Sequence, residues 1–260
     1  MTATLPPYPK GHNILAGKTV LVTAAAGTGI GFAAAKRAAE EGATVMISDI
    51  HERRLGDAAT ALADVMKTRP PSRICNVTRE ADVQALIDAA ISEMGHIDVL
   101  INNAGLGGFA PLVDMTDEQW HAVLDVTLNG TFRMTRAALR HMMPRGSGSI
   151  VNNASVLGWR AQAGQAHYAA AKAGVMALTR CAAIEAATAN VRVNAVSPSL
   201  ATHEFLAKVT PPGLLEELSA REAFGRAAAP WEVANVIVFL ASDYSSYMTG
   251  EVVSVSSQHP

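Results

Sequence analysis

Charged residues are scarce in this chain of 260 residues. They make up 17% of the sequence, and 21 Lys and Arg against 23 Asp and Glu leave a net charge of −2. A balance so close to neutral provides no general electrostatic attraction for nucleic acid, so we expect no nucleic-acid partner. Because 49% of the residues are apolar, the composition also excludes an intrinsically disordered chain.

Long hydrophobic runs and disulfide patterns are missing too. No stretch approaches the roughly 18 apolar residues that a membrane-spanning helix needs, and the start of the chain lacks the pattern of a secretory signal. Cys75 and Cys181 are the only cysteines, and neither they nor the histidines show a metal-binding spacing. We therefore expect a cytoplasmic protein with reduced, buried thiols, no membrane partner and no metal.

Short runs rich in Val and Ile alternate with alanine-rich helical stretches after a proline-rich arm at residues 1–16. The predicted strands are Thr19–Thr23, Thr44–Ser48, Ser72–Cys75, Val99–Asn102, Ser149–Asn152, Val191–Val196 and Val252–Val255. The predicted helices are Gly31–Glu41, Glu52–Met66, Glu80–Met94, Asp117–Met143, Gln165–Thr188 and Pro230–Ser242. This alternation predicts an α/β fold in which a doubly wound, mainly parallel seven-stranded Rossmann sheet carries helices on both faces. We expect residues 17–260 to form one nucleotide-binding domain, with residues 199–225 inserted as a lid over the substrate.

A turn of small residues, Thr23–Gly31, joins the first predicted strand to the first predicted helix. Small residues let backbone amides approach a pyrophosphate, whose charge a helix N-terminus favours. A plain tight turn is the alternative. Asp49 follows the second strand, 20 residues after Gly29. A carboxylate there accepts hydrogen bonds from ribose hydroxyls and repels a 2′-phosphate, which predicts NAD rather than NADP; the alternative is that Asp49 only caps the next helix.

Tyr168 and Lys172 stand four residues apart in a predicted helix, and Ser155 lies 13 residues before Tyr168 at the end of the fifth strand. Residues i and i+4 share a helix face. A lysine ammonium close to a phenol lowers the pKa of the phenol from about 10, which suits proton exchange with a substrate hydroxyl or carbonyl. We therefore predict that Tyr168 is the general acid–base and that Ser155 holds the same substrate oxygen. A coincidental surface pair is the alternative for Tyr168 and Lys172.

These motifs, with Asn102-Asn103-Ala104-Gly105 after the fourth strand and Pro198 after the sixth, make the chain resemble the single-domain short-chain dehydrogenases/reductases over about residues 15–256. The resemblance implies an NAD(P)-dependent oxidoreductase. It implies that the catalytic residues are Ser155, Tyr168, Lys172 and Thr127. It implies that the cofactor-binding residues are Thr23, Ala25, Gly27, Thr28, Gly29, Ile30, Asp49, Asn76, Val77, Asn103, Ala104, Gly105, Tyr168, Lys172, Pro198 and Ser199.

Several positions depart from the family pattern. The first glycine of the turn is an alanine, Ala24 or Ala25, and the turn has one extra residue. Because alanine in the left-handed region costs about 1 kcal/mol, we expect the extra residue to re-route the turn. Asn76 replaces an aspartate that accepts a hydrogen bond from the adenine amino group, and its amide oxygen can still accept. Thr127 replaces the usual catalytic asparagine, so we expect a proton-relay water to be held by Thr127 and the backbone or to be lost.

Apolar residues surround the predicted site. They are Leu106, Phe109 and Trp159 after the strands, and Leu200, Phe205, Leu206, Val209, Leu214, Leu215, Leu218 and Phe224 in the predicted lid. They favour a hydrophobic secondary alcohol or ketone as the substrate, although helix packing explains the lid leucines equally well.

The turn, the segment Trp159–Tyr168 and the end Ser256–Pro260 resemble reductases of bacterial sterol-ring catabolism, which implies a CoA thioester of a steroid ring fragment as the substrate. A 3-oxoacyl-carrier-protein reductase is one alternative. A non-catalytic NAD-binding sensor or scaffold is another, from a different class. The family resemblance also implies a homotetramer.

Overall fold

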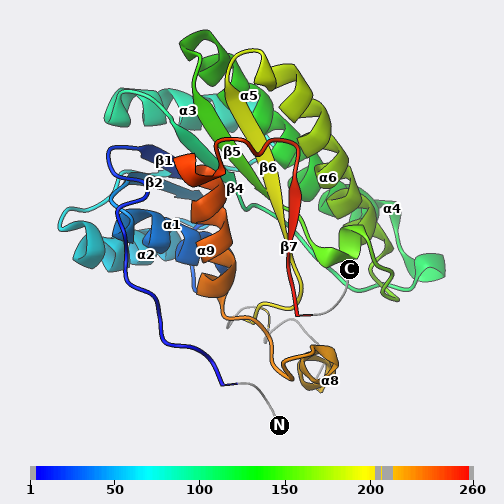
Figure 1. Cartoon of the computed structure of the whole chain (residues 1–260). Helices are drawn as coiled ribbons and strands as arrows, with labels where there is room; N and C mark the ends of the chain where they lie inside the picture. The colour runs from blue at the N-terminus through cyan, green and yellow to red at the C-terminus, as the bar shows by residue number, and fades with distance from the viewer. Residues whose placement is uncertain (1–3, 203–205, 207–212, 258–260) are drawn as a thin grey trace.

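The computed structural model of the chain describes residues 4–202, 206 and 213–257. Its centre is a seven-stranded parallel sheet in the order β3-β2-β1-β4-β5-β6-β7 (Figure 1). The strands are β1 (Thr19–Val22), β2 (Thr44–Asp49), β3 (Ser72–Ile74), β4 (Val99–Asn102), β5 (Gly148–Asn153), β6 (Val191–Pro198) and β7 (Val252–Val255). The helices are α1 (Ile30–Glu40), α2 (Glu52–Met66), α3 (Glu80–Met94), α4 (Asp117–Leu124), α5 (Gly130–Arg145), α6 (Ala166–Ala187), α8 (Leu214–Arg221) and α9 (Pro230–Ala241). The predicted fold class is thereby confirmed.

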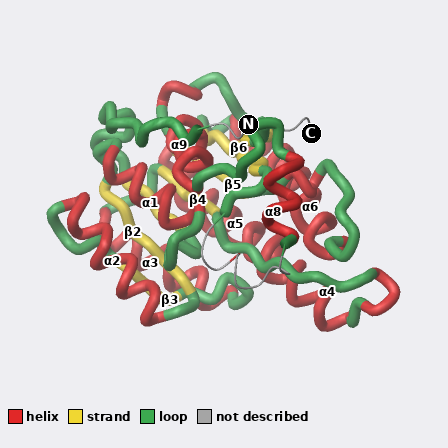
Figure 2. Tube along the Cα trace, turned by 90° about the horizontal axis from the view of Figure 1, so that it is seen from below, coloured by secondary structure: helices red, strands yellow, loops and turns green. Residues whose placement is uncertain are grey.

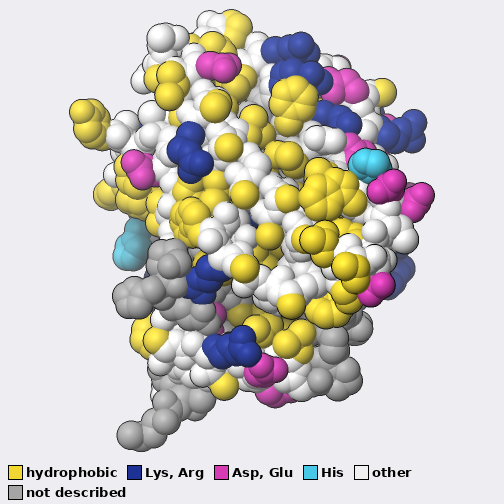
Figure 3. Space-filling view, turned by 90° about the vertical axis from the view of Figure 1, so that its right-hand side faces the viewer, with side chains coloured by type: hydrophobic (Ala, Val, Ile, Leu, Met, Phe, Trp, Pro, Cys, Tyr) yellow, Lys and Arg dark blue, Asp and Glu magenta, His cyan; other side chains and the backbone are white. Residues whose placement is uncertain are grey.

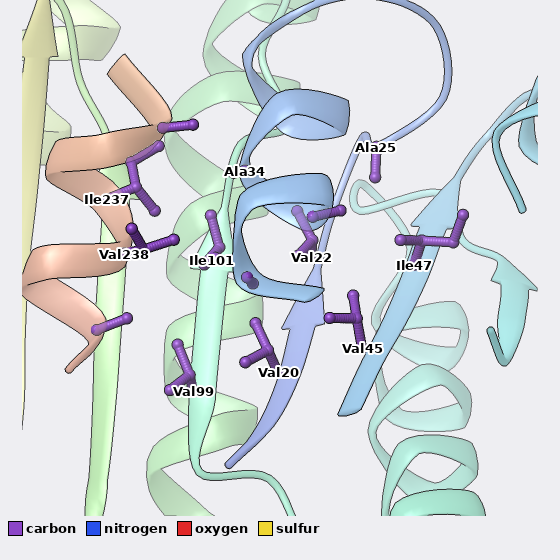
Figure 4. Packing of buried hydrophobic residues seen from close by; sticks show 14 of the residues in the cluster. Val20, Val22, Ala25, Ala34, Val45, Ile47, Val99, Ile101, Ile237 and Val238 are labelled. Atoms are coloured by element: carbon purple, nitrogen blue, oxygen red, sulfur yellow. The ribbon is translucent and has the colours of Figure 1, made fainter. Parts of the chain in front are cut away.

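The side chains of each central strand alternate between two buried faces of the sheet. Val20 and Val22 of β1 pack in the layer of α1, α2 and α9, whereas Leu21 packs in the layer of α3, α5 and α6. Figure 4 shows the first of these layers, with α1 lying across β1 and β4. Because both faces are covered, the central strands β1 and β4 are mainly apolar, and the polar side chains of the site stand at strand ends. Figure 2 looks onto the carboxyl end of the sheet, where loops and α8 gather.

The predicted helix Asp117–Met143 is interrupted. One wide π turn, Asp125–Asn129, joins α4 to α5. Thr116 caps the start of α4 through a reciprocal hydrogen-bond pair with Gln119. π turns inside α-helices are frequent at functional sites, and this one contains Thr127, which is fully buried.

The proline-rich arm is anchored to α1. The Tyr8 hydroxyl donates to Glu40 at 2.6 Å, and the Tyr8 ring meets Trp231 of α9 edge-on with ring centroids 5.4 Å apart. Arg37 and Glu41 form a buried ion pair beneath the arm. The carboxylate of Glu41 also accepts hydrogen bonds from backbone N–H groups of the arm. A buried ion pair is tolerated only when its remaining polar atoms find partners, and the arm supplies some of them.

Two expectations about exposure meet different outcomes. Cys75 is buried, and desolvation raises the pKa of its thiol to about 12. Cys181 is exposed on α6, so the prediction that both thiols are buried is wrong for Cys181.

Within the described residues, no helix is long and apolar enough to cross a membrane. The lid residues Phe205 and Val209 lie outside the described residues, and the lid prediction is not tested there.

Candidate functional site

The turn between β1 and α1 is held in a strained conformation. Ala24 has a φ of +50° and Gly27 a φ of +99°. The expectation that the extra residue removes the strain at the alanine position is therefore wrong. The tight packing behind the turn explains this, because a Cβ at Gly31 would lie 2.3 Å from the Ala24 oxygen and 2.4 Å from Asn103 Nδ2. Gly31 thus permits the contact that fixes Ala24.

Replacing Ala24 by glycine is expected to raise the free energy of unfolding by about 0.5–1 kcal/mol. Glycine removes the left-handed strain of roughly 1–2 kcal/mol and adds a smaller conformational entropy to the unfolded chain. Urea unfolding followed by circular dichroism measures the change. Ala25→Gly is the matched control, since Ala25 is fully buried and its φ is not positive; this control is expected to destabilise. A destabilised Ala24→Gly variant would show that φ at this residue stores no strain.

The amino end of α1 completes a cradle that fits a pyrophosphate. The helix begins at Ile30 after the N-cap Gly29, and within the described residues no side chain caps it. The first N–H groups of a helix carry partial positive charge and bind phosphate oxygens when no side chain takes them. The glycines at Gly27 and Gly29 leave the approach to these N–H groups clear of side chains. Thr23, Ala25, Gly27, Thr28, Gly29 and Ile30 all belong to this turn, as predicted from the sequence.

Asp49 lies at the end of β2, directly against the turn. One carboxylate oxygen accepts from the Ala26 N–H at 3.1 Å and the other from the His51 N–H at 3.0 Å. Desolvation raises the pKa of Asp49, and the Ala26 N–H opposes that rise. The N-cap of α2 is His51, which receives no side-chain cap. The alternative that Asp49 only caps the next helix therefore does not describe its contacts, because it also holds the turn.

Asn76 and Val77 follow β3. The Asn76 Oδ1 accepts hydrogen bonds from both the N–H and the hydroxyl of Thr78, at 3.0 and 2.9 Å. An amide oxygen has two lone pairs. In this conformation both are used, so Oδ1 is not the open acceptor that we expected for an adenine amino group. Val77 is buried and packs against Gly130 at the start of α5.

Ser155 and Tyr168 meet beyond the end of β5. Their side chains are hydrogen-bonded, and this contact lowers the pKa of Tyr168. Desolvation outweighs it and raises the pKa of the phenol to about 12. Ser155 Oγ also accepts from the Leu157 N–H at 3.2 Å, which fixes its rotamer. The phenol and the hydroxyl thus form a pair that a single substrate oxygen can address.

Lys172 shares the face of α6 with Tyr168 but does not lower its pKa here. The ammonium lies 5.5 Å from the centroid of the phenol ring and donates to the Asn153 carbonyl at 2.5 Å. Burial lowers the pKa of Lys172 to about 8. The predicted depression of the Tyr168 pKa is therefore absent in this conformation, because desolvation dominates both groups and the ammonium is turned to the backbone. Lys172 is buried, and Tyr168 is half-buried and hydrogen-bonded to Ser155, so the two are not a coincidental surface pair.

Thr127 fastens the loop after β4 over these residues. Its hydroxyl accepts from the Leu106 N–H at 2.9 Å and donates to the Leu106 carbonyl at 3.1 Å. Its own carbonyl accepts from the Thr131 hydroxyl at 2.8 Å. A Cβ at Gly105 would lie 3.6 Å from Lys172 Nζ, so the loop passes close to the lysine. Both polar functions of the Thr127 side chain are thus used in holding the loop.

The remaining predicted residues stand around the same end of the sheet. Asn103 donates from Nδ2 to the Ala24 carbonyl at 3.0 Å, so its side chain supports the turn. Ala104 donates its N–H to the Thr23 hydroxyl at 3.3 Å. Pro198 pairs with β7, and the Ser199 N–H donates to the Val255 carbonyl at 3.2 Å.

Apolar side chains form the mouth of the site. Leu106, Phe109 and Trp159 are exposed by 41%, 58% and 43%. An open groove of about 490 Å³ runs between the loop after β4 and residues 161–164, with Phe109 in its wall. Phe224, near the end of the predicted lid, is exposed as well. The loop that carries Leu106 and Phe109 passes beside the Ser155–Tyr168 pair, since a Cβ at Gly107 would lie 4.0 Å from Tyr168 Cδ2.

Asn153, the last residue of β5, is a site residue that the sequence did not predict. Its carbonyl accepts from Lys172, and its Nδ2 donates to Asn103 Oδ1 at 2.9 Å. One signal was present in the sequence: neighbouring residues of a strand face opposite sides, so Asn152 and Asn153 cannot both belong to the same buried layer. Asn152 bonds Thr179 of α6, which leaves Asn153 for the side of α1.

Comparison with known proteins gives consistent matches along the chain. A family model described as enoyl-(acyl carrier protein) reductase matches residues 24–257. A hydroxy-methyl-oxo-hexahydro-indene-carboxyl-CoA reductase of Mycobacterium tuberculosis is 64% identical over 252 residues, which are 96% of each chain. A 3-oxoacyl-acyl-carrier-protein reductase of Thermotoga maritima is 41% identical over 241 residues, 93% of this chain and 97% of its own. The crystal structure of a short chain dehydrogenase from Mycobacterium smegmatis superposes with a TM-score of 0.88 at 58% identity, covering 99% of both chains.

Proposed function

Because this chain belongs to the short-chain dehydrogenase/reductase family of nicotinamide-dependent oxidoreductases, we propose that it transfers hydride between NAD(H) and a ketone or secondary alcohol on a hydrophobic ring system carried as a CoA thioester. The observation that carries the chemistry is the group of Ser155, Tyr168 and Lys172 beside the loop that Thr127 holds, in which Ser155 and Lys172 are buried and Tyr168 is half-buried. The ring and the thioester are proposed from the relative that is 64% identical.

The protein side chains handle the proton and the substrate oxygen. With a pKa near 12, Tyr168 carries its proton, so it can donate that proton to a ketone oxygen during reduction. In the reverse direction the deprotonated phenol oxygen accepts the proton of the alcohol. Ser155 donates a hydrogen bond to the same oxygen and orients it. Lys172 stabilises negative charge on the phenol oxygen after the proton has left. The nicotinamide supplies or accepts the hydride when it is bound.

Thr127 acts in this scheme as a positioning residue. Its hydroxyl is engaged on both sides by the backbone of Leu106. A proton relay through that hydroxyl would require it to give up one of these bonds. We therefore assign Thr127 to holding the loop against Lys172 and Tyr168.

NAD is the cofactor that we propose, on the strength of Asp49. The carboxylate ends the strand beside the turn and is only 7% exposed. A 2′-phosphate placed next to a poorly solvated carboxylate meets charge repulsion, whereas ribose hydroxyls find an acceptor.

The substrate is tested with the purified protein and four combinations of cofactor and thioester. A bicyclic keto-carboxyl-CoA and acetoacetyl-CoA are each supplied with NADH and with NADPH, and nucleotide absorbance is followed. We expect kcat/KM for the bicyclic thioester with NADH to exceed that for acetoacetyl-CoA by about 10²-fold, since an apolar site gains roughly 1–3 kcal/mol from a well-fitting ring. Equal or better use of acetoacetyl-CoA favours the second candidate, a 3-oxoacyl-carrier-protein reductase, which the Thermotoga relative supports. Cofactor binding without turnover of any ketone would support the sensor or scaffold hypothesis.

We also propose that the protein is a cytoplasmic homotetramer. Ile184 of α6 and Phe132 of α5 are exposed by 77% and 42%. Figure 3, which views the molecule from the side of α6, shows hydrophobic side chains gathered on that face. Exposed apolar patches of this kind mark contacts between subunits. Light scattering tests the proposal, and a mass of one 27.2 kDa chain would contradict it.

A further inference from the structure

Three strand ends are tied together by a row of side-chain hydrogen bonds. Asn153 of β5 donates from Nδ2 to Asn103 Oδ1 at 2.9 Å. Asn103, just after β4, donates from Nδ2 to the carbonyl of Ala24, just after β1, at 3.0 Å. At the other end, Lys172 Nζ donates to the Asn153 carbonyl. Asn153 therefore lies between the strained turn and the lysine of the catalytic group.

The chemistry of the row fixes the orientation of both amides. A backbone carbonyl can only accept, so Asn103 must present its Nδ2 to Ala24 and its Oδ1 to Asn153. Asn153 must in turn present its Nδ2 to Asn103. Its Oδ1 therefore points away from the row and cannot be exchanged with Nδ2 by turning the amide over.

This oxygen is a buried acceptor with an unmet hydrogen bond. Asn153 Oδ1 is fully shielded and finds no donor among the residues that the structure describes. The side chain of Asn152, the neighbouring residue in β5, is fully hydrogen-bonded. Its Oδ1 accepts from Asn102 and its Nδ2 donates to Thr179. Leaving a buried acceptor without a donor is costly, so such atoms point to a ligand or an ordered water.

We propose that Asn153 Oδ1 accepts a hydrogen bond from the nicotinamide half of the dinucleotide. This inference rests on the proposed function. The pyrophosphate is expected at the turn of Ala24, and the nicotinamide must stand at the group of Ser155, Tyr168 and Lys172, where the hydride is exchanged. Asn153 lies between these two points, so the nicotinamide nucleoside is the part of the ligand that passes it. That nucleoside offers two kinds of donor, the carboxamide N–H and the ribose O–H.

Asn153→Leu tests the proposal, because leucine has nearly the shape of asparagine but no acceptor. Dissociation constants are measured by calorimetry for NADH and for ADP, which lacks the nicotinamide nucleoside. We expect the variant to bind NADH about 5-fold more weakly and ADP as well as the wild type does, as for the loss of one neutral hydrogen bond. Asn153→Ala serves in the same way if the leucine variant does not fold. Gln84→Leu, which removes an exposed amide on α3, is the matched control with both constants unchanged.

Two outcomes would overturn the proposal. Unchanged NADH binding would mean that Oδ1 holds only water, and an equal loss for NADH and ADP would mean that Asn153 merely supports the turn. Both differ from a failure of the proposed function, in which the wild type itself does not bind NADH. The 3-acetylpyridine analogue of NAD, which has no carboxamide N–H, separates the two donors. If Asn153→Leu binds this analogue more weakly than the wild type does, the donor is the ribose hydroxyl. If the variant and the wild type bind the analogue equally well, the donor is the carboxamide.

Discussion

Replacing Tyr168 by phenylalanine is expected to lower kcat by about 10³-fold, the usual contribution of a positioned general acid–base. The phenol is the only group in the described site that both meets Ser155 and carries a proton near neutral pH. Phenylalanine fills the same space, so the packing of this α6 side chain remains. Steady-state oxidation and reduction with the preferred substrate measure the effect.

Two controls separate chemistry from structure in this variant. The dissociation constant for NADH should stay within about 2-fold of the wild type, because removing a group that acts mainly in the transition state leaves ground-state binding intact. Tyr244→Phe removes a phenol hydroxyl from a side chain that is 74% exposed, and it should retain full activity. A Tyr168→Phe enzyme with a tenth or more of the wild-type kcat would contradict the assignment of the proton donor.

Asp49→Asn is expected to shift the ratio of kcat/KM with NAD to that with NADP by about 10²-fold toward NADP. A hydrogen bond to a charged group contributes about 1.5–3 kcal/mol, and the same carboxylate repels a phosphate. Asparagine keeps an acceptor oxygen for either the Ala26 or the His51 N–H, so the turn retains part of its support. Parallel titrations with the two nucleotides give the ratio.

Asp57→Asn is the matched control for that substitution. Asp57 also lies on the β2–α2 unit, but its side chain is 71% exposed and faces Arg53 at 3.8 Å. The same loss of charge at this surface position should leave the nucleotide ratio unchanged, because exposed charges are screened by water and salt. An Asp49→Asn enzyme with the wild-type ratio, or a wild type that prefers NADP, would refute the role of Asp49.

The strands were predictable because each follows from its own residues. Runs such as Thr19–Val22 are apolar on both sides, which occurs in sheets covered on both faces. Ser155, Tyr168 and Lys172 were predictable for a similar reason, since their spacing along a strand end and a helix places them together.

Features that depend on lateral neighbours were not predictable in this way. The strain at Ala24 is set by Gly31 and Asn103, which pack behind it. The preference of alanine for negative φ, taken alone, predicts a relaxed turn. The pKa of Tyr168 was expected to fall because charge attraction is visible in a sequence and desolvation is not. The role of Asn153 requires knowing that β4 lies beside β5, 50 residues away in the chain.

The row that joins Ala24, Asn103 and Asn153 also bears on how the protein folds. Its two hydrogen bonds span sequence separations of 79 and 50 residues. Contacts of such long range form late, because the chain loses the entropy of closing a long loop before the contact contributes any stabilising energy. The first strand–helix–strand unit can therefore form early and still hold its nucleotide turn in a relaxed shape. Affinity for a nucleotide should accordingly return in refolding experiments only when β4 and β5 have joined β1, later than the recovery of helical signal.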